Sequence, residues 1–330
     1  MKRLSCTLLI VMLIVGLFAL TGLAEELTIG YVGNLAADSN VAAYGGMVDY
    51  AERMEWKIEL IDLENDITRT SPAMLNFVSM GVDAIVVCCS EAAIIEQGVT
   101  AATEAGIPVF LSDTENIGKT IVNGTTNCWA MGALVGSQVV DRIRAMKPEG
   151  GNVAIIGMPD LYVHRQREQM MAAVFNSPEN TDINLVEIET CDVATWPTRP
   201  YEITRNWITK YGDDLDAIIG TWDGIGWGIS RAILDSGMTK DDIFTMSIDG
   251  SDQTYDLIRR GDPFVAVIAQ NFAGWSEVVG DAIQAVVVEG RDPAEVVPVS
   301  RTVYVPYKWI DSTNVPAQGE TVEFDYEGLF

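Results

Sequence analysis

The sequence alternates short apolar runs with longer amphipathic segments along most of its length. The segment 81–116 shows the pattern clearly, because residues 84–87 are wholly apolar and Ile95, Val99 and Ala102 then recur at helical spacings. A chain of such strand-helix-strand units builds parallel sheets covered by helices, so the sequence predicts an α/β fold. Strand-like apolar runs lie at 27–33, 57–63, 82–88, 107–112, 152–157, 184–190, 215–221, 243–248 and 263–269.

The first residues have the pattern of a signal peptide. Lys2 and Arg3 precede an apolar run, and small residues up to Ala24 stand where a signal peptidase cuts. We therefore expect residues 1–24 to be removed and the protein to be exported to a periplasm. An uncleaved anchor is the alternative, but the run is shorter than the roughly 20 apolar residues of a spanning helix. Cys6 precedes the run, which argues against a lipid anchor at the cleavage point.

The chain is strongly acidic. Without residues 1–24 it has 19 basic and 47 acidic side chains, a formal charge of −28. Binding to nucleic acid depends on clustered Lys and Arg side chains that displace counter-ions from phosphates, so nucleic acid is excluded as a partner. We interpret the high negative charge as a feature that keeps the protein soluble. The alternative is an acidic surface on which a partner docks.

Four cysteines follow the predicted signal peptide, namely Cys88, Cys89, Cys128 and Cys191. Export permits disulfides, but Cys88 and Cys89 end a buried strand, where unreacted thiols serve equally well. The cysteines lack paired C-x-x-C spacing and His164 is far from them in sequence, so we expect no metal site. The sequence contains no G-x-S-x-G motif and no phosphate-binding loop, and we expect no cofactor.

Polar residues follow several of the predicted strands. In open α/β sheets, ligands bind beyond the carboxyl ends of the strands, where Asp113 is expected. Asp66 follows the second strand and is expected to cap the helix that ends at Met80. Trp196 is flanked by Thr and Pro residues typical of a loop, which favours an exposed aromatic over a core position.

These motifs resemble those of the periplasmic sugar-binding proteins of the ribose, galactose and xylose group. The resemblance begins with Gly-Val-Asp, followed by Glu-Ala-Gly-Ile-Pro-Val and an acidic residue in the segment 81–116, and it continues in order along residues 62–275. It implies a type I periplasmic binding protein with two Rossmann-like lobes, parallel sheets flanked by helices and a three-stranded hinge. The chain would cross between lobes near 126, 270 and 298. The N-terminal lobe is then expected at 25–126 plus 271–298, and the C-terminal lobe at 127–270 plus 299–330.

The resemblance also implies which residues bind a ligand. Asp113 and Asp249 would accept hydrogen bonds from sugar hydroxyls, and Arg167, or Arg165 as second choice, would donate to ring and hydroxyl oxygens. Trp196 would stack on the sugar. Further ligand contacts are expected from Trp222, Asp223, Gln270, His164, Asp38 and Asn40.

Three positions depart from the family pattern. Thr114 stands where the family often has arginine, and Trp222 stands where it usually has an asparagine that contacts the ligand. The aspartate that follows, Asp223, caps a helix in the family. The loop after the first strand lacks the family's aromatic residue, so this aromatic partner is either missing or supplied by Tyr44.

The sequence therefore predicts a monomeric solute-binding protein. It would close by a hinge on a carbohydrate or polyol and deliver it to a membrane ABC permease. An exported carbohydrate-acting enzyme using Asp113 and Asp249 is one alternative, and a receptor that passes a signal molecule to a sensor is another. A transcription regulator of related fold would need a basic helix-turn-helix where the predicted signal peptide lies.

Overall fold

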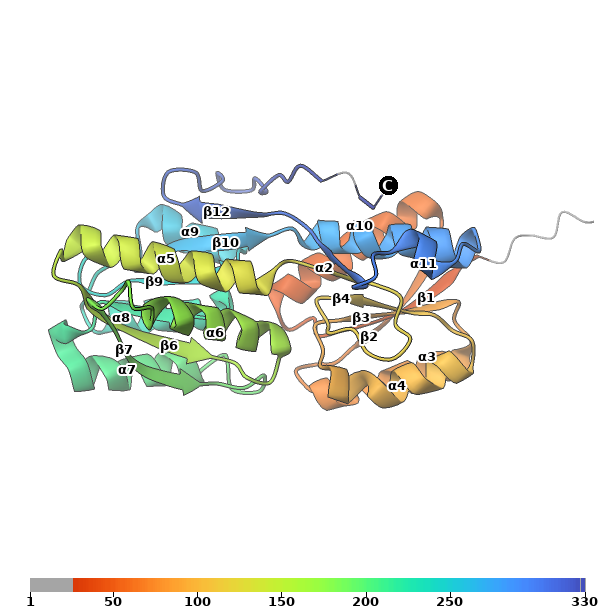
Figure 1. Ribbon diagram of the computed structural model, residues 1–330, viewed down its shortest axis with the longest axis horizontal. Coiled ribbons are helices and arrows are strands. Elements are labelled where there is room, and N and C mark those ends of the chain that lie inside the picture. Colours follow the sequence, from red (N-terminus) through yellow and green to blue (C-terminus); the bar gives the residue numbers. More distant parts are fainter. Residues whose placement is uncertain (1–25, 327, 330) are drawn as a thin grey trace, which may run out of the picture.

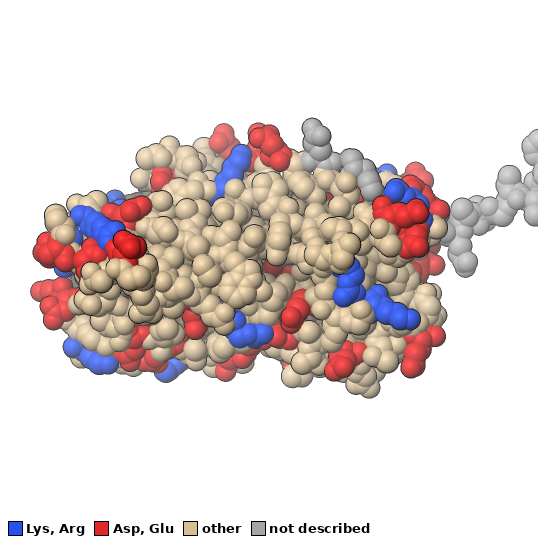
Figure 2. All heavy atoms as spheres, viewed as in Figure 1, with Lys and Arg blue, Asp and Glu red and all other residues tan. Residues whose placement is uncertain are grey.

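A computed structural model describes residues 26–326, 328 and 329, so the predicted signal peptide lies outside the described residues. The molecule is elongated and consists of two α/β lobes placed end to end (Figure 1). Within the described part of the chain, no helix combines the length and the apolar character needed to cross a membrane. Asp and Glu side chains gather toward both ends of the molecule, and the middle of the viewed face carries few charges (Figure 2).

The first lobe contains one parallel sheet. Apolar runs of five or six residues form its central strands because both faces of the sheet are covered, which favours continuous rather than alternating hydrophobicity. The strands are β1 (Thr28–Gly33), β2 (Lys57–Asp62), β3 (Ala84–Cys88), β4 (Val109–Ser112), β5 (Asn123–Thr125) and β11 (Thr302–Tyr304). Their order across the sheet is β11-β5-β4-β3-β1-β2, and every neighbouring pair is parallel.

Helices cover both faces of this sheet. Apolar side chains of α2 and α10, including Met47 and Trp275, pack with Tyr31 and Val86 on one face. Those of α3 and α4 pack on the other face. The helices are α2 (Asp38–Met54), α3 (Thr70–Met80), α4 (Ala92–Glu104), α10 (Phe272–Ile283) and α11 (Pro293–Val296), with a 3₁₀ turn at Ile67–Arg69 and a π-helical turn at Gln284–Val288.

The second lobe repeats this architecture. Its strands form the groups β7-β6-β8 and β12-β10-β9, and a single bridge from Ala217 to Phe244 links the two groups. All pairs are parallel except β10 with β12. The strands are β6 (Gly151–Gly157), β7 (Ile183–Thr190), β8 (Ala217–Gly220), β9 (Thr245–Asp249), β10 (Phe264–Gln270) and β12 (Tyr307–Asp311).

Five helices flank these strands. Val153 and Ile155 of β6 face α5 and α6, whereas Ala154 and Ile156 face α7 and α8, as expected for a strand buried on both sides. The helices are α5 (Cys128–Met146), α6 (Tyr162–Phe175), α7 (Arg199–Tyr211), α8 (Asp223–Asp235) and α9 (Asp252–Arg260), with a 3₁₀ turn at Gly212–Asp214. The predicted α/β fold with parallel sheets is confirmed.

Among the described residues, the chain passes between the lobes at three connections between named elements, which lie between β5 and α5, between β10 and α10, and between β11 and β12. The segment after β12 then returns to the first lobe, where the Leu329 backbone N–H donates to Asp281 of α10. The third passage comes later than the position near 298 expected from the resemblance, because β11 pairs with β5 in the first sheet. Residues 302–304 therefore lie with the first lobe and not with the second.

Three short strands were not expected from the sequence. The strands β5, β11 and β12 are three to five residues long and mix apolar with polar residues, so hydrophobic pattern alone does not distinguish them from loops. The predicted cap at Asp66 is also corrected. Its carboxylate accepts the Thr68 amide at 3.1 Å and begins the 3₁₀ turn that precedes α3, not α3 itself.

Candidate functional site

A cavity of about 50 Å³ lies between the lobes, beyond the carboxyl ends of their strands. Because parallel strands end at one edge of each sheet, residues distant in sequence meet there. Seven of the ten residues predicted to bind a ligand line this cavity, namely Asn40, Asp113, His164, Arg167, Trp196, Trp222 and Asp249.

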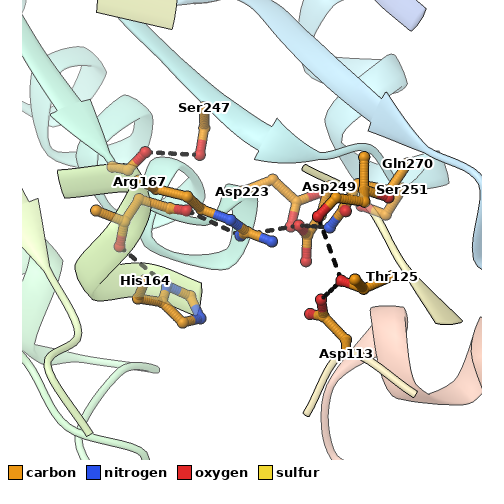
Figure 3. Close-up of polar contacts among 12 residues, drawn as sticks. Asp113, Thr125, His164, Arg167, Asp223, Ser247, Asp249, Ser251 and Gln270 are labelled. Carbon is orange, nitrogen blue, oxygen red and sulfur yellow. Dashed lines mark hydrogen bonds and ion pairs between the residues drawn. The ribbon is translucent and has the colours of Figure 1, made fainter. Parts of the chain in front are cut away.

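Arg167 is the centre of a buried polar network. Its guanidinium donates to the Thr221 carbonyl at 3.1 Å and forms an ion pair with Asp249 at 3.0 Å. The Gln270 amide donates to the same Asp249 oxygen at 2.6 Å. Figure 3 shows Arg167 reaching from its helix toward Asp249 and Gln270. The arrangement holds both charged side chains in one orientation.

Close packing of two helices positions Arg167. A Cβ atom at Gly132 of α5 would lie 2.5 Å from the Arg167 carbonyl oxygen, so only glycine lets α6 approach this closely. Arg167 is then 1% exposed and its Nε has no hydrogen-bond partner among the described residues. A buried donor without a partner is costly, and a ligand oxygen at Nε would satisfy it.

Arg167 and Asp249 each stabilise the charged form of the other. Burial alone would lower the pKa of Arg167, but Asp249 together with neighbouring groups raises it above its ordinary value. Burial raises the pKa of Asp249, while Arg167 and Gln270 lower it and so oppose this effect. Arg167 is therefore a permanent cation in the cavity.

Asp113 belongs to the first lobe and follows β4. It is 3% exposed, has a left-handed backbone with φ of 46°, and accepts a hydrogen bond from the Thr125 hydroxyl. Burial raises the pKa of Asp113 to about 6, although Arg167 and Thr125 lower it. Figure 3 shows Asp113 and Thr125 on the side of the site away from His164.

Two indoles form the apolar wall. The ring centres of Trp196 and Trp222 are 4.6 Å apart with an interplanar angle of 65°, an edge-to-face contact. Trp227 was not predicted, and it packs behind both rings with centres 6.3 and 6.4 Å away. Trp222 is buried and Trp196 is half-buried, so both present apolar surface to the cavity.

His164 lies on α6, one turn before Arg167. Its Nδ1 is 3.0 Å from the Thr221 hydroxyl, and its ring meets Trp222 edge-on. Burial lowers the pKa of His164 well below its usual range, and Arg167 and Arg165 lower it further. The ring is therefore neutral in this environment.

Arg165, the second choice for the ligand arginine, lies elsewhere. Its guanidinium is 2.9 Å from Glu91 at the start of α4, and it also donates to the Pro159 carbonyl. It does not line the cavity, so the structure favours Arg167 for the predicted role.

The remaining predicted residues line a second cavity, of about 660 Å³, that adjoins the first at Ser39 and Asp249. Asp38, Asp223 and Gln270 belong to this second cavity. Asp38 is exposed, and Gln270 is buried.

Asp223 does not cap its helix, which corrects one expectation from the resemblance. The N-cap of α8 is Trp222 and makes no side-chain capping bond. The Asp223 carboxylate instead accepts hydrogen bonds from Ser251 at 3.0 Å and Thr254 at 2.8 Å. Burial, together with the charge of the nearby Asp249, raises the pKa of Asp223 to about 8.

The first lobe contributes residues that sequence reasoning did not select. Asn34 and Asn65 exchange hydrogen bonds of 3.0 and 2.9 Å, which connects the ends of β1 and β2. The predicted residue Asn40 accepts a hydrogen bond from the Asn34 backbone N–H at 3.3 Å and lines the same cavity. The position of Asn34 directly after β1 is the signal that identifies it. Other unpredicted lining residues are Ser39, Ile67, Cys89, Met158 and Trp275.

Tyr44 does not supply the aromatic residue missing from the first-strand loop. Its ring meets Tyr31 edge-on at 5.1 Å and does not line the cavity. Trp275 of α10 lies there instead, held by a bond from its Nε1 to the Thr126 hydroxyl at 3.0 Å.

The four cysteines of the described chain are free thiols. Cys88 and Cys89 have sulfur atoms 3.1 Å apart, and the contact together with burial raises the pKa of Cys89 well above its ordinary value. Among the described residues, no group of three or more His, Cys, Asp or Glu side chains is placed to hold a metal ion.

Comparisons with known proteins agree with this geometry. Residues 29–292 match the sequence model of a family described as periplasmic binding protein domain. A protein of Rhizobium meliloti named for rhizopine binding is 24% identical over 82% of this chain and 85% of its own. The galactofuranose-binding protein of Escherichia coli is 26% identical over 91% of this chain and 94% of its own.

A solved structure shares the fold. A solute-binding protein of an ABC transporter from Agrobacterium vitis, crystallised with allitol, superposes with a TM-score of 0.77 at 20% identity, over 88% of this chain and 97% of the other. Because the family match spans most of the described residues and both lobes, the chain belongs to the periplasmic binding protein domain family.

Proposed function

We propose that the protein captures a sugar or polyol between its lobes and delivers it to a membrane ABC importer. The relatives named for rhizopine and galactofuranose binding, and the transporter protein crystallised with allitol, support this class of ligand and partner. The protein acts as a monomer in the periplasm, in keeping with its family and with the predicted signal peptide.

One observation supports the proposal most strongly. A single cavity between the lobes is lined by one arginine, two carboxylates and a pair of indoles. Asp113 and Asp249 are acceptors for ligand hydroxyls, and Arg167 donates to ligand oxygens through its unpartnered Nε. Trp196 and Trp222 cover the apolar C–H face of a ring. Polar groups then set the hydroxyl pattern while the indoles supply contact area.

The small volume of the cavity requires motion. A space of about 50 Å³ holds only a few water molecules and no sugar ring. The lobes must therefore separate to admit a ligand and close around it, and the three connecting segments act as the hinge. Ligand contacts to both lobes stabilise the closed state.

The site suits binding better than catalysis. A glycosidase needs two carboxyl groups free to act as acid and base or nucleophile at a set separation. Here Asp249 is held by Arg167 and Gln270, and Asp113 is held by Thr125. Incubation with a panel of glycosides is expected to leave them intact, and measurable turnover would overturn this proposal.

The test of ligand class is a thermal-shift screen of the purified mature protein against pentoses, hexoses, linear polyols and cyclitols, followed by calorimetry on the hits. A ligand at a hundredfold excess over its Kd stabilises the folded state by about 2.7 kcal/mol, which such a screen resolves. Absence of binding by every sugar and polyol, with binding of another class such as amino acids, would contradict the proposal.

A further inference from the structure

The second cavity has an unusual charge composition. Five aspartates line it, and none of the described residues that line it is Lys, Arg or His. We call it the acidic cavity; its aspartates are Asp38, Asp49, Asp223, Asp249 and Asp252.

The acidic cavity spans both lobes. Asp38 and Asp49 lie on α2 of the first lobe, whereas Asp223, Asp249 and Asp252 come from the second. Closure of the lobes thus brings carboxylates toward carboxylates, which opposes closure unless a positive charge lies between them. Asp38 is near enough to Asp223 to raise the pKa of Asp223.

The acidic cavity continues into the ligand cavity through Asp249. Arg167 is the single permanent cation among the described residues that line either cavity, because His164 is neutral. Three buried carboxylates line the two cavities, those of Asp113, Asp223 and Asp249, each at most 6% exposed, and Arg167 forms its ion pair with Asp249. A buried carboxylate needs a cation or protonation, and one arginine cannot neutralise three.

An unpartnered acceptor points to the missing group. Gln270 lines the acidic cavity and is 4% exposed, and its Oε1 has no hydrogen-bond partner among the described residues. Its Nε2 is already used by Asp249. Carboxylates beside a free amide oxygen form a set of acceptors that suits a donor with several N–H groups and a positive charge.

A metal ion is not the cation that fits. None of the described acidic groups is arranged as a set of three or more ligands for one metal ion. The nearby indoles, Trp196 and Trp222, favour an organic ring and also attract cations through their faces.

We propose that the ligand is a hydroxylated ring bearing a protonated amine, with its hydroxyls at Arg167 and its ammonium group facing Asp249, Gln270 Oε1 and the acidic cavity. This rests on the proposed function and narrows its ligand class from sugars and polyols to amino sugars and aminocyclitols.

The test compares matched pairs of ligands by calorimetry at pH 7. One pair is myo-inositol and an aminocyclitol in which an amine replaces one hydroxyl, and the other is glucose and glucosamine. We expect the amine of at least one pair to bind about tenfold or more tightly than its neutral partner, because its ammonium group forms charge-assisted hydrogen bonds with the carboxylates. If in both pairs the neutral ring binds as tightly as its amine, or more tightly, this inference is overturned but the proposed function stays intact. Failure of every ring and polyol overturns the proposed function as well.

Two substitutions locate the amine. Asp223→Asn and Asp38→Asn each remove one carboxylate from the acidic cavity, and both are expected to lower the ratio of the two affinities severalfold. Asp38 is exposed, so Asp38→Asn tests the charge without disturbing a buried group. Asp213→Asn is the control. It removes the same charge from an exposed turn that precedes β8, at the end of this strand opposite to Asp223. If the ratio of amine affinity to neutral-ligand affinity is the same in the parent protein and in all three variants, the amine lies elsewhere and the assignment is overturned.

Proton release gives an independent readout. With a pKa of about 8, Asp223 is largely protonated at pH 7, and an ammonium beside it favours the ionised form. Calorimetry in two buffers of different ionisation enthalpy should therefore detect proton release with the amine and little with its neutral partner. Release of the same amount with both ligands, or with neither, contradicts an amine placed at this carboxyl group.

Discussion

Glu91 of the first lobe forms an ion pair of 2.9 Å with Arg165 of the second. The same carboxylate accepts the backbone N–H of Tyr162, at the start of α6. These contacts join the N-terminal ends of α4 and α6 across the gap between the lobes. They exist only while the lobes are close together, so Glu91 stabilises the closed state without lining the cavity.

Glu91→Gln should therefore weaken ligand binding without changing ligand preference. The Arg165 side chain is 40% exposed, so after allowance for solvent screening the pair contributes up to about 1 kcal/mol, or roughly fivefold in Kd. Calorimetry with the best ligand measures the change. Glu96→Gln on the exposed face of α4 is the matched control. An unchanged Kd in Glu91→Gln would show that the contact does not contribute to closure.

Arg167→Lys should weaken binding nearly as much as Arg167→Ala. A lysine keeps the charge but cannot donate at once to Thr221, Asp249 and a ligand oxygen, because it lacks the planar fork. Losing a charged contact in a desolvated site costs about 2 to 4 kcal/mol of binding free energy. If lysine restores the original Kd, Arg167 supplies only positive potential and its geometry is irrelevant.

Asp249→Ala should reduce binding by a similar amount and also lower stability. From the sequence we would expect the fold to be unaffected, but Asp249 is the buried counter-ion of Arg167. Removing one partner of a buried pair destabilises a protein by about 3 to 5 kcal/mol. Urea unfolding without ligand measures this loss, and Asp252→Ala on the exposed side of the acidic cavity is the control. A urea unfolding curve equal to that of the parent protein would contradict the structural role of Asp249.

Trp222→Asn should raise the affinity for ribose relative to six-membered rings. The indole favours ligands with a large C–H face, by about 25 cal/mol for each Å² that it covers, whereas an asparagine would bind two hydroxyls. Trp196→Ala should weaken all ring ligands because the two indoles pack against each other. Tryptophan fluorescence and calorimetry with ribose, a hexose and a cyclitol measure both effects. If the parent protein and Trp222→Asn rank the three ligands in the same order of affinity, Trp222 contributes only to packing.

The stability of the ligand-free protein should increase as the pH is lowered from about 7 to about 5. Burial raises the pKa of Asp113 to about 6, above the value near 3.9 in an unfolded chain, so folding disfavours the ionised form. The unfolded chain releases this proton near pH 3.9 and the folded protein only near pH 6, so the loss of stability accumulates between these pH values and is complete above them, on the order of 2 to 3 kcal/mol. Asp223 and Asp249 act in the same direction. Melting temperatures across this range test the sign, and Asp113→Asn should flatten the curve.

Much of the architecture could be predicted from the sequence. Long apolar strands such as β3 and β6 are buried on both faces, and their helices carry one apolar face, so hydrophobic pattern and chain order determine parallel strand-helix-strand units. The short strands β5, β11 and β12 could not be predicted in this way. The strands β11 and β12 each pair with one neighbouring strand, β5 pairs with β4 and β11 over no more than three residues each, and none of the three has a strong pattern of its own.

The sequence also identified the residue types at the strand ends, because ligands of such folds bind there. Arg167, Asp249, Trp196 and Trp222 were all selected in advance, and the structure brings them to one cavity. Their binding roles remain predictions.

Only the tertiary structure decided how these side chains share their partners. The choice of Arg167 over Arg165 depends on the close approach of α5 at Gly132 and on Glu91, which is far from both in sequence. The role of Asp223 likewise depends on Ser251 and Thr254. A single sequence specifies local pattern and spacing, whereas buried charge balance depends on contacts between segments distant in sequence, and those contacts form only when the segments fold together.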